Sequence, residues 1–215
     1  MTNEEKCSEF VEEIYINYRK PQGEHAVDVL HDMNKSHEKL ATWATSHLQL
    51  DGNELILDIG CGGGANIKRF SSMTKNKVFG LDYSSKSVEE SIKFNQESVD
   101  AGNVEVLEGS VSDIPFEDGV FDLVTAFETT YFWPDLENDL KEIHRVLKDD
   151  GQILIAVTDT ADKEFGEKML KAIDFLEMNL PTNDEMIKTL ESAGFTKISL
   201  FIKDIDDYSC YIARK

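Results

Sequence analysis

Short apolar runs alternate with helical patterns from about Asn53 onward, and this alternation constrains the fold more than any other feature of the chain. Helical patterns follow Gly64, begin after Ser84 as an N-cap, and start again near Asp135. The runs are nearly continuous in Val, Ile, Leu and Phe, as strands buried on both faces of a sheet are. They are ELILDIG, KVFGLD, VEVLEG, FDLVTAF and GQILIAVT. Because strand–helix–strand units run their strands in parallel, we predict an α/β fold around a parallel sheet.

Two further helices and a hairpin are predicted to follow the fifth run. The first helix spans residues 165–176. The second opens at Thr182 with Glu185 three residues on, a capping box, and ends at Gly194 as its C′ residue. The tail forms two predicted strands, TKISLFIK and DYSCYIAR, joined by an acidic turn. We expect this antiparallel hairpin to form one edge of the sheet.

The first fifty residues have a different pattern and are predicted to form a helical lid. They contain two helical stretches on either side of residues 20–23. Four of the five histidines lie in this segment, at His25, His31, His37 and His47. The length of the chain fits one domain over residues 1–215. Its predicted parts are the lid (1–50), a ligand-binding core (51–160) and the C-terminal helices with the hairpin (161–215).

An excess of acidic residues limits the partners that the chain can have. Asp and Glu number 42 against 22 Lys and Arg, a formal net charge of −20, and a surface of this sign repels phosphate backbones. Lys and Arg form no cluster interleaved with aromatic residues, so we expect no nucleic-acid partner. No apolar run approaches the roughly 20 residues that cross a bilayer, and the acidic start MTNEEKCSEF is unlike a secretory signal. We therefore expect a cytoplasmic protein without a membrane partner.

Cysteine usage points to the same compartment. Cys7, Cys61 and Cys210 are far apart and form no CxxC pair, which fits reducing conditions and predicts no metal site. A catalytic or metalloid-binding trio of thiols is the alternative. Cys61, however, lies inside a glycine loop where a small residue is required for packing.

The glycine loop LDIGCGGG, residues 57–64, ends one predicted strand and opens a helix. At such a junction, helix-terminal amides and residues without a Cβ let a ligand approach the backbone closely. Taken alone, the loop admits two classes of cofactor. Gly60, Gly62 and Ala65 also satisfy the relaxed dinucleotide fingerprint, with Asp82 about 20 residues further on. The glycines therefore predict a cofactor site without fixing the cofactor.

Three acidic residues near successive strand ends separate these classes. Asp58 lies two residues before the first glycine, where a carboxylate favours an ammonium or sulfonium and disfavours a pyrophosphate. Asp82 ends the second strand and can accept both hydroxyls of a ribose, and Tyr83 follows it to stack on a base. Asp113 follows the third strand, where it can accept an adenine amino group, although singly it is also an ordinary turn acid. We expect the three carboxylates to converge on one adenosyl sulfonium.

Together these motifs resemble the class I methyltransferases that depend on S-adenosylmethionine (SAM), in the small-molecule branch that includes the ubiquinone and menaquinone methyltransferases. The likeness covers residues 54–157. LDIGCGGG resembles the first motif of that family, LDYS its ribose-binding acid, and SVSDIPFEDGVFDLV its adenine-binding acid with the fourth strand. EIHRVLKDDGQILI resembles its helix and turn into the fifth strand, with Asp149 and Asp150 where Pro-Gly is commoner. The resemblance implies a Rossmann-like, seven-stranded sheet of order 3-2-1-4-5-7-6, with the last strand antiparallel and helices on both faces.

The resemblance also implies roles for residues. SAM is the expected cofactor, with S-adenosylhomocysteine as its product and no metal. The expected cofactor-binding residues are Asp58, Gly60, Cys61, Gly62, Asp82, Tyr83, Ser112, Asp113 and Phe127. The aromatic loop after the fourth strand is expected to form a substrate wall, because aromatic faces stabilise cations and orient apolar acceptors. Its predicted residues are Thr130, Tyr131, Phe132 and Trp133. A hydrophobic cluster beside a helix is the alternative interpretation of this loop.

The implied reaction transfers a methyl group from SAM to an O, N, S or C atom of a small molecule by in-line displacement, mainly through proximity and orientation. A general base is optional, and its candidates are His37, His31 and Tyr18, brought over the site by the lid. A histidine on an apolar helix face, such as His37, is also a common core residue. Two alternatives stay open, a non-catalytic SAM-binding sensor or partner module and an NAD-dependent oxidoreductase. We expect a monomer or a homodimer.

Overall fold

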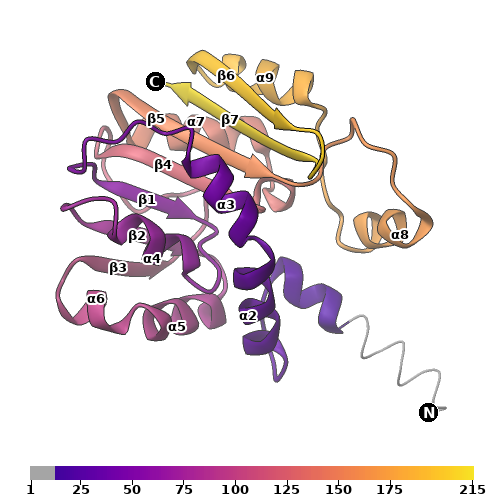
Figure 1. Cartoon of the computed structure of the whole chain (residues 1–215), viewed down its shortest axis with the longest axis horizontal. Coiled ribbons are helices and arrows are strands. Elements are labelled where there is room, and N and C mark those ends of the chain that lie inside the picture. The colour runs from indigo at the N-terminus through magenta and orange to yellow at the C-terminus, as the bar shows by residue number, and fades with distance from the viewer. Residues whose placement is uncertain (1–12) are drawn as a thin grey trace.

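Seven strands form one sheet in the order β3-β2-β1-β4-β5-β7-β6 (Figure 1). The computed structural model describes residues 13–215, so Cys7 and the start of the predicted lid lie outside the described residues. The strands are β1 (Ile56–Ile59), β2 (Val78–Asp82), β3 (Val104–Glu108), β4 (Phe121–Phe127), β5 (Leu147–Val157), β6 (Thr196–Lys203) and β7 (Tyr208–Arg214). β1 to β5 pair in parallel, whereas β7 is antiparallel to β5 and β6. The predicted strand order and the antiparallel last strand are confirmed.

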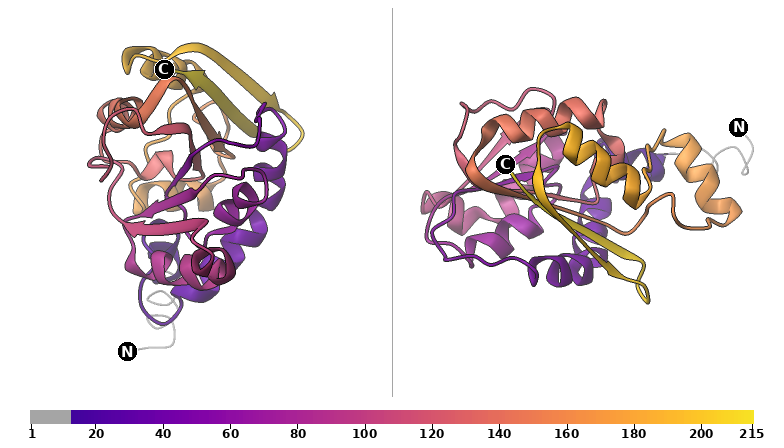
Figure 2. Two further views of the ribbon diagram at one scale, coloured as in Figure 1. Left: turned by 90° about the vertical axis from the view of Figure 1, so that its left-hand side faces the viewer. Right: turned by 90° about the horizontal axis from the view of Figure 1, so that it is seen from above.

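Helices cover both faces of this sheet (Figure 2). They are α2 (Ala26–Ser36), α3 (Glu38–Thr45), α4 (Ala65–Ser71), α5 (Ser85–Phe94), α6 (Gln96–Asp100), α7 (Leu136–Val146), α8 (Glu167–Phe175) and α9 (Asn183–Ser192). α7 and α9 share one hydrophobic cluster with the sheet, and α3 and α4 share the other. α2 packs against α5, and α8 projects from the sheet beyond the end of β5 (Figure 1).

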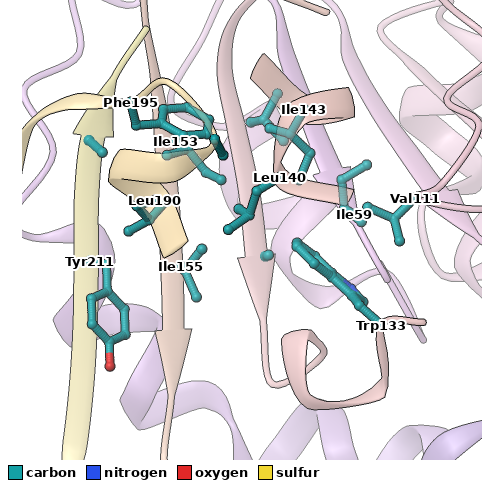
Figure 3. Close-up of a cluster of buried hydrophobic side chains, with 14 of the residues drawn as sticks. Ile59, Val111, Trp133, Leu140, Ile143, Ile153, Ile155, Leu190, Phe195 and Tyr211 are labelled. Atoms are coloured by element: carbon teal, nitrogen blue, oxygen red, sulfur yellow. The ribbon is translucent and has the colours of Figure 1, made fainter. Parts of the chain in front are cut away.

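The near-continuous apolar runs follow from burial on both faces. In β1, Ile56 belongs to the cluster under α3 and α4, and its neighbour Leu57 belongs to the cluster under α7 and α9. Successive side chains of a strand point to opposite faces, so each face of the sheet needs its own apolar set. Figure 3 shows the second cluster, where Leu140 of α7 and Leu190 of α9 approach Ile155 of β5.

Side-chain caps fix where the helices begin, as the sequence predicted. Ser84 accepts a hydrogen bond from the Ser87 amide at the start of α5. Thr182 and Glu185 form a full capping box at the start of α9, with each side chain bonded to the other's backbone amide. Each such bond satisfies an amide that the first helical turn leaves without a partner. Gly194 follows α9 with φ +100°, the left-handed conformation expected of a C′ residue.

The N-terminal segment differs from the prediction in its number of helices. Residues 13–19 are helical, but the expected second stretch divides into α2 and α3 at His37. His37 has φ −83° and ψ −4°, a ψ far from the roughly −42° of a regular α-helix. The apolar spacing continues across the break, since Leu30 and Leu40 are both buried, so periodicity alone did not reveal it.

Gly80 in the middle of β2 is required for the close approach of α4. A Cβ at this position would overlap Ile67 Cδ1 and lie 3.0 Å from Cys61 Sγ. We expect Gly80→Ala to lower the free energy of unfolding by about 1–3 kcal/mol, because overpacking forces neighbours off their rotamers. Urea denaturation measures this change. Gly166→Ala is the matched control, since nothing lies within 4 Å of its added Cβ; equal destabilisation by both would contradict the packing argument.

Candidate active site

A cavity opens at the carboxyl ends of β1, β2 and β4, the edge where ligands of open α/β sheets bind. The glycine loop forms its floor, the loop after β4 one side, and the N-terminal segment with the α2–α3 junction the other. Its charged or ionisable lining residues are Tyr18, Arg19, His37, Glu38, Cys61, Asp82, Tyr83 and Glu128. The cavity is therefore built from segments that are distant in the sequence, with the glycine loop at its centre.

The glycine loop is held open by two close neighbours. Gly60 has φ +65°, and a Cβ there would overlap Thr129 Oγ1 and lie 2.9 Å from Thr129 Cβ. A Cβ at Gly63 would lie 2.6 Å from Asn34 Nδ2, and the same Asn34 amide donates to the Gly63 carbonyl at 3.1 Å. Residues without a side chain thus let the loop after β4 and helix α2 approach the loop backbone directly.

Asp82, the last residue of β2, lines the cavity with a carboxylate that also organises the glycine loop. Its Oδ2 accepts from the Gly62 amide at 2.9 Å, and its Oδ1 accepts from the Ser84 amide at 2.9 Å. Burial raises the pKa of Asp82, and these two hydrogen bonds oppose the rise. An ionised carboxylate has about four acceptor positions, so two stay available to a ligand diol.

Asp58 lies beneath the glycine loop and does not line the cavity. It is 1% exposed, and its Oδ1 accepts from Thr125 Oγ1 at 2.7 Å. Burial raises the pKa of Asp58 to about 7, the Thr125 hydrogen bond opposes the rise, and the charge of Asp82 adds to it. A cation placed in the cavity would favour the ionised form of Asp58.

Residues 19–21 bridge the rim of the cavity. Tyr83 Oη donates to the Arg19 carbonyl, and Ser84 Oγ donates to the Pro21 carbonyl at 2.6 Å. On the other side, Arg19 Nη1 donates to the Leu176 carbonyl at 2.9 Å, just past α8. The N-terminal segment therefore joins the end of β2 to α8 across the mouth of the site.

The loop after β4 supplies a carboxylate and two aromatic side chains. Glu128, the first residue after β4, lines the cavity, and so do Phe132 and Trp133, here called the aromatic wall. Figure 3 shows Trp133 beside Ile59 and Val111, which also line the cavity. The 3-10 helix η1 (Thr130–Phe132) carries one residue of this wall.

The other two predicted wall residues, Thr130 and Tyr131, do not line the cavity. Both are buried, and Tyr131 faces Glu128, to which its hydroxyl donates at 2.8 Å. The Tyr131 carbonyl accepts from the Asn179 amide at 2.9 Å, which ties η1 to the segment after α8. Tyr131 thus supports the wall from behind.

Of the three predicted bases, the structure brings two to the cavity. Tyr18 and His37 line it, whereas His31 faces α5 and its Nε2 lies 2.8 Å from Glu90 Oε1. Helix α2 packs against α5, and His31 lies on that side of the helix and does not line the cavity. Burial lowers the pKa of His37 to about 4, so its imidazole is neutral at pH 7 and a weak base.

Most of the predicted cofactor-binding residues line the cavity. They are Gly60, Cys61, Gly62, Asp82, Tyr83 and Phe127. Ser112 and Asp113 do not; Ser112 Oγ donates to Asp139 Oδ1 at 2.6 Å, and Asp113 is exposed in the turn beside Ser110 and Val111, which do line it. The three carboxylates that were expected to converge therefore do not all line the cavity. Asp82 lines it, Asp58 lies behind its floor, and Asp113 lies outside its lining.

Several lining residues were not predicted as site residues, among them Arg19, Asn34 and Glu128. Glu128 could have been found by the rule that selected Asp82 and Asp113, since it is the first acid after a parallel strand. The positions of Arg19 and Asn34 at the cavity depend on how the N-terminal segment folds back, which no local pattern shows.

Among residues 13–215, no group of three His, Cys, Asp or Glu side chains is placed to hold a metal ion. No helix in that range is long and apolar enough to cross a membrane.

Comparison with known proteins shows the family of this chain. Residues 57–155 match the family described as "Methyltransferase domain". YrhH of Bacillus subtilis, a protein named as a methyltransferase, is 33% identical over 130 residues, which cover 57% of this chain and 71% of YrhH. The sarcosine/dimethylglycine N-methyltransferase of Halorhodospira halochloris is 29% identical over 153 residues, covering 70% of this chain. That match spans only 54% of the relative's own length.

A solved structure shares the fold at low sequence identity. Phosphoethanolamine N-methyltransferase 2 of Haemonchus contortus, in complex with phosphomonomethylethanolamine and S-adenosylhomocysteine, superposes with a TM-score of 0.76. The two chains are 15% identical, and the match covers 89% of this chain and 58% of that one. At this identity the likeness shows the fold and leaves the acceptor to be argued from the residues of the cavity.

Proposed function

Because this chain belongs to the SAM-dependent methyltransferases of class I, we propose that it transfers the methyl group of SAM to a small-molecule acceptor bound between Glu128 and the aromatic wall. The observation that carries the proposal is Asp82, a largely buried carboxylate with free acceptor positions beside an open glycine loop. A small acceptor is supported by a relative that is named as a sarcosine and dimethylglycine methyltransferase.

The charges around the cavity fit SAM better than a dinucleotide. Asp82 and Glu128 line the cavity and Asp58 lies behind its floor, so a pyrophosphate would meet three carboxylates. A ligand with a sulfonium, an ammonium and a ribose diol meets favourable partners at the same places. Asp82 would hold the ribose hydroxyls, the glycine loop the amino-acid end, and Tyr83 one edge of the base.

The residues of this chain act by placement and by excluding water. When bound, SAM supplies a methyl group that is attached to a cationic sulfur. The sulfur fragment leaves as a neutral thioether once the methyl group has been transferred. The aromatic wall holds the acceptor against the loop, and Glu128 offers it a hydrogen-bond acceptor. Residues 19–21 bridge the mouth of the site and would help to keep the reacting atoms aligned and dry.

Labelled SAM tests this function. We expect the purified chain to move a labelled methyl group to a small molecule in a panel of amines, thiols and phenols or in a filtered cell extract. S-adenosylhomocysteine should form in equal amount. SAM binding without any transfer would indicate a sensor module instead. Failure to bind SAM would overturn the cofactor assignment, and label on protein or nucleic acid would overturn the small-molecule acceptor.

A further inference from the structure

Glu128 has an unusual backbone conformation for its residue type. Its φ is +54°, the left-handed region that non-glycine residues seldom adopt and that costs on the order of 1 kcal/mol. Three hydrogen bonds hold the carboxylate in place. Oε1 accepts from the Thr158 amide at 2.6 Å, and Oε2 accepts from Thr158 Oγ1 at 3.0 Å and from Tyr131 Oη at 2.8 Å. The surrounding structure therefore fixes one orientation of this side chain.

That orientation places Glu128 beside the cofactor loop. Ala126 of β4 pairs with Ile59 of β1, so the residues just after these two strands meet at one edge of the sheet. Thr129 packs on Gly60 so closely that no side chain fits between them. Glu128 precedes Thr129 and lines the same cavity, which places it where the glycine loop and the acceptor side of the cavity meet.

The Glu128 carboxylate has no cationic partner among residues 13–215 of the structure. Its three hydrogen-bond donors are the Tyr131 hydroxyl, the Thr158 hydroxyl and the Thr158 amide, and they occupy three of its roughly four acceptor positions. Burial raises the pKa of Glu128 to about 7, the Tyr131 and Thr158 hydrogen bonds oppose the rise, and the charge of Asp159 adds to it. An enclosed carboxylate of this kind is stabilised when a cation joins it.

The remaining charges of the cavity lining favour a cationic acceptor over an anionic one, and Lys20, which is not a lining residue, has its Nζ 5.0 Å from the centre of the Tyr83 ring. The lining holds three carboxylates, Glu38, Asp82 and Glu128, against one guanidinium, that of Arg19. Arg19 already donates to the Leu176 carbonyl and to Glu177 outside the cavity lining. A phosphate or carboxylate group on the acceptor would therefore find no free cation among the described lining residues. A cationic acceptor would find Glu128 on one side and the faces of Phe132 and Trp133 nearby.

We propose that the acceptor is an amine, and that Glu128 is the residue that binds its nitrogen between the carboxylate and the aromatic wall. This inference rests on the proposed methyl transfer and names its substrate class. The carboxylate takes a proton from the ammonium form of the acceptor and leaves a lone pair on the nitrogen. That lone pair forms the N–C bond to the methyl carbon while the S–C bond breaks, with its electrons staying on sulfur. The product is the methylated ammonium, and Glu128 releases its proton to solvent.

Binding to the protein saturated with S-adenosylhomocysteine tests this inference without requiring turnover. The probes are benzylamine and butylamine, each compared with the alcohol and the thiol of the same carbon skeleton by isothermal titration. We expect each amine to bind at least ~10-fold more tightly than its alcohol, because a charged hydrogen bond is lost in the alcohol. Glu128→Gln should remove this preference while changing the affinity for SAM less than ~3-fold.

Two further variants separate recognition from damage to the fold. Glu108→Gln is the matched control, since Glu108 ends β3 as an exposed acid outside the cavity lining; it should keep the amine preference. Tyr131→Phe should reduce the preference only in part, because it removes one of the three hydrogen bonds to Glu128. Thermal unfolding checks that each variant is folded.

The outcomes distinguish the amine inference from the proposed function. Equal binding of amine and alcohol, or an amine preference that survives in Glu128→Gln, would overturn the amine inference. So would labelled-methyl transfer from SAM to thiols, alcohols or isoprenoid alkenes in preference to amines, although methyl transfer itself would then stand. If Glu128→Gln weakened SAM binding as much as amine binding, Glu128 would be the counter-ion of the sulfonium instead. Failure of the wild type to bind SAM would overturn the proposed function.

Discussion

Replacing Asp82 with Ala should weaken SAM binding at least ~100-fold, because two hydrogen bonds to a charged group, each about 1.5–3 kcal/mol, are lost with the ribose diol. The Gly62 amide also loses its partner at 2.9 Å, so the glycine loop becomes less ordered. Isothermal titration of SAM into both proteins measures the difference.

Glu108→Ala provides the control for this substitution. Glu108 ends β3 in register with Asp82 and is likewise an acid at a strand end, but it is exposed and does not line the cavity. It should leave the affinity for SAM within ~2-fold of the wild type, since surface substitutions away from the site have small effects. Unchanged binding in Asp82→Ala, or equal loss in both variants, would show that the ribose is held elsewhere.

Asp58→Asn should raise the free energy of unfolding at pH 8 by about 2–4 kcal/mol, a stabilising effect unusual for a substitution in the core. The reason is the raised pKa of Asp58, which moves from 3.8 to about 7 mainly through burial. At a pH between these two pKa values, Asp58 is protonated in the folded chain and ionised in the unfolded chain. Stability therefore falls as the pH rises through this window, and above it the wild type carries the full penalty of a buried charge.

The pH dependence of unfolding separates this effect from ordinary packing changes. The advantage of Asp58→Asn should vanish below about pH 3, where the folded and unfolded wild type are both largely protonated at this site, and grow toward pH 8. Glu128 contributes a slope of the same sign to both proteins, so the comparison isolates Asp58. Urea denaturation at several pH values gives the curve. A variant that is less stable than the wild type at pH 8 would show that a folded-state partner stabilises the charged Asp58.

The same substitution should weaken SAM binding about 10-fold, since it removes a negative charge from behind the floor of the cavity. Higher stability together with lower affinity is the signature of a charge that is kept for function. An affinity equal to that of the wild type would mean that Asp58 acts only on the fold.

The parts of the fold that depend on local chemistry could be predicted from the sequence. Strand β4 and the strands of the hairpin follow from their apolar residues, and the capping box at Thr182 marks the start of α9. The strand order was implied by the resemblance of the motifs to a known family, and the structure agrees with it. Asp82 was found because the rule for strand ends in a parallel sheet is geometric and needs no tertiary detail.

Other parts of the site could not be predicted because they depend on packing between distant segments. The break at His37 separates α2, which packs against α5, from α3, which packs against β5, although the apolar spacing runs on without a signal. The positive φ of Glu128 is held by Tyr131 and Thr158, which lie on different elements. The turn after β3 leaves Asp113 exposed while its neighbour Val111 lines the cavity, a difference that spacing does not encode.

The glycine loop is the sequence feature on which the geometry of the cavity depends most. Its missing side chains let Thr129 and Asn34 approach, and this approach brings the loop after β4 and helix α2 to one cavity. The Asp82 carboxylate then fixes the loop through Gly62 while keeping acceptor positions for a ligand. The fold thereby brings the carboxylates of Asp82 and Glu128 to the lining of one cavity, where we propose that they bind the cofactor and the acceptor.

Titration of SAM and NAD⁺ into the wild-type chain in parallel tests this account most directly. We predict that SAM binds at one site per chain, that S-adenosylhomocysteine competes for it, and that NAD⁺ gives no binding heat. Binding of NAD⁺ in the absence of SAM binding would contradict the account, because the carboxylates around the glycine loop would then accept a pyrophosphate.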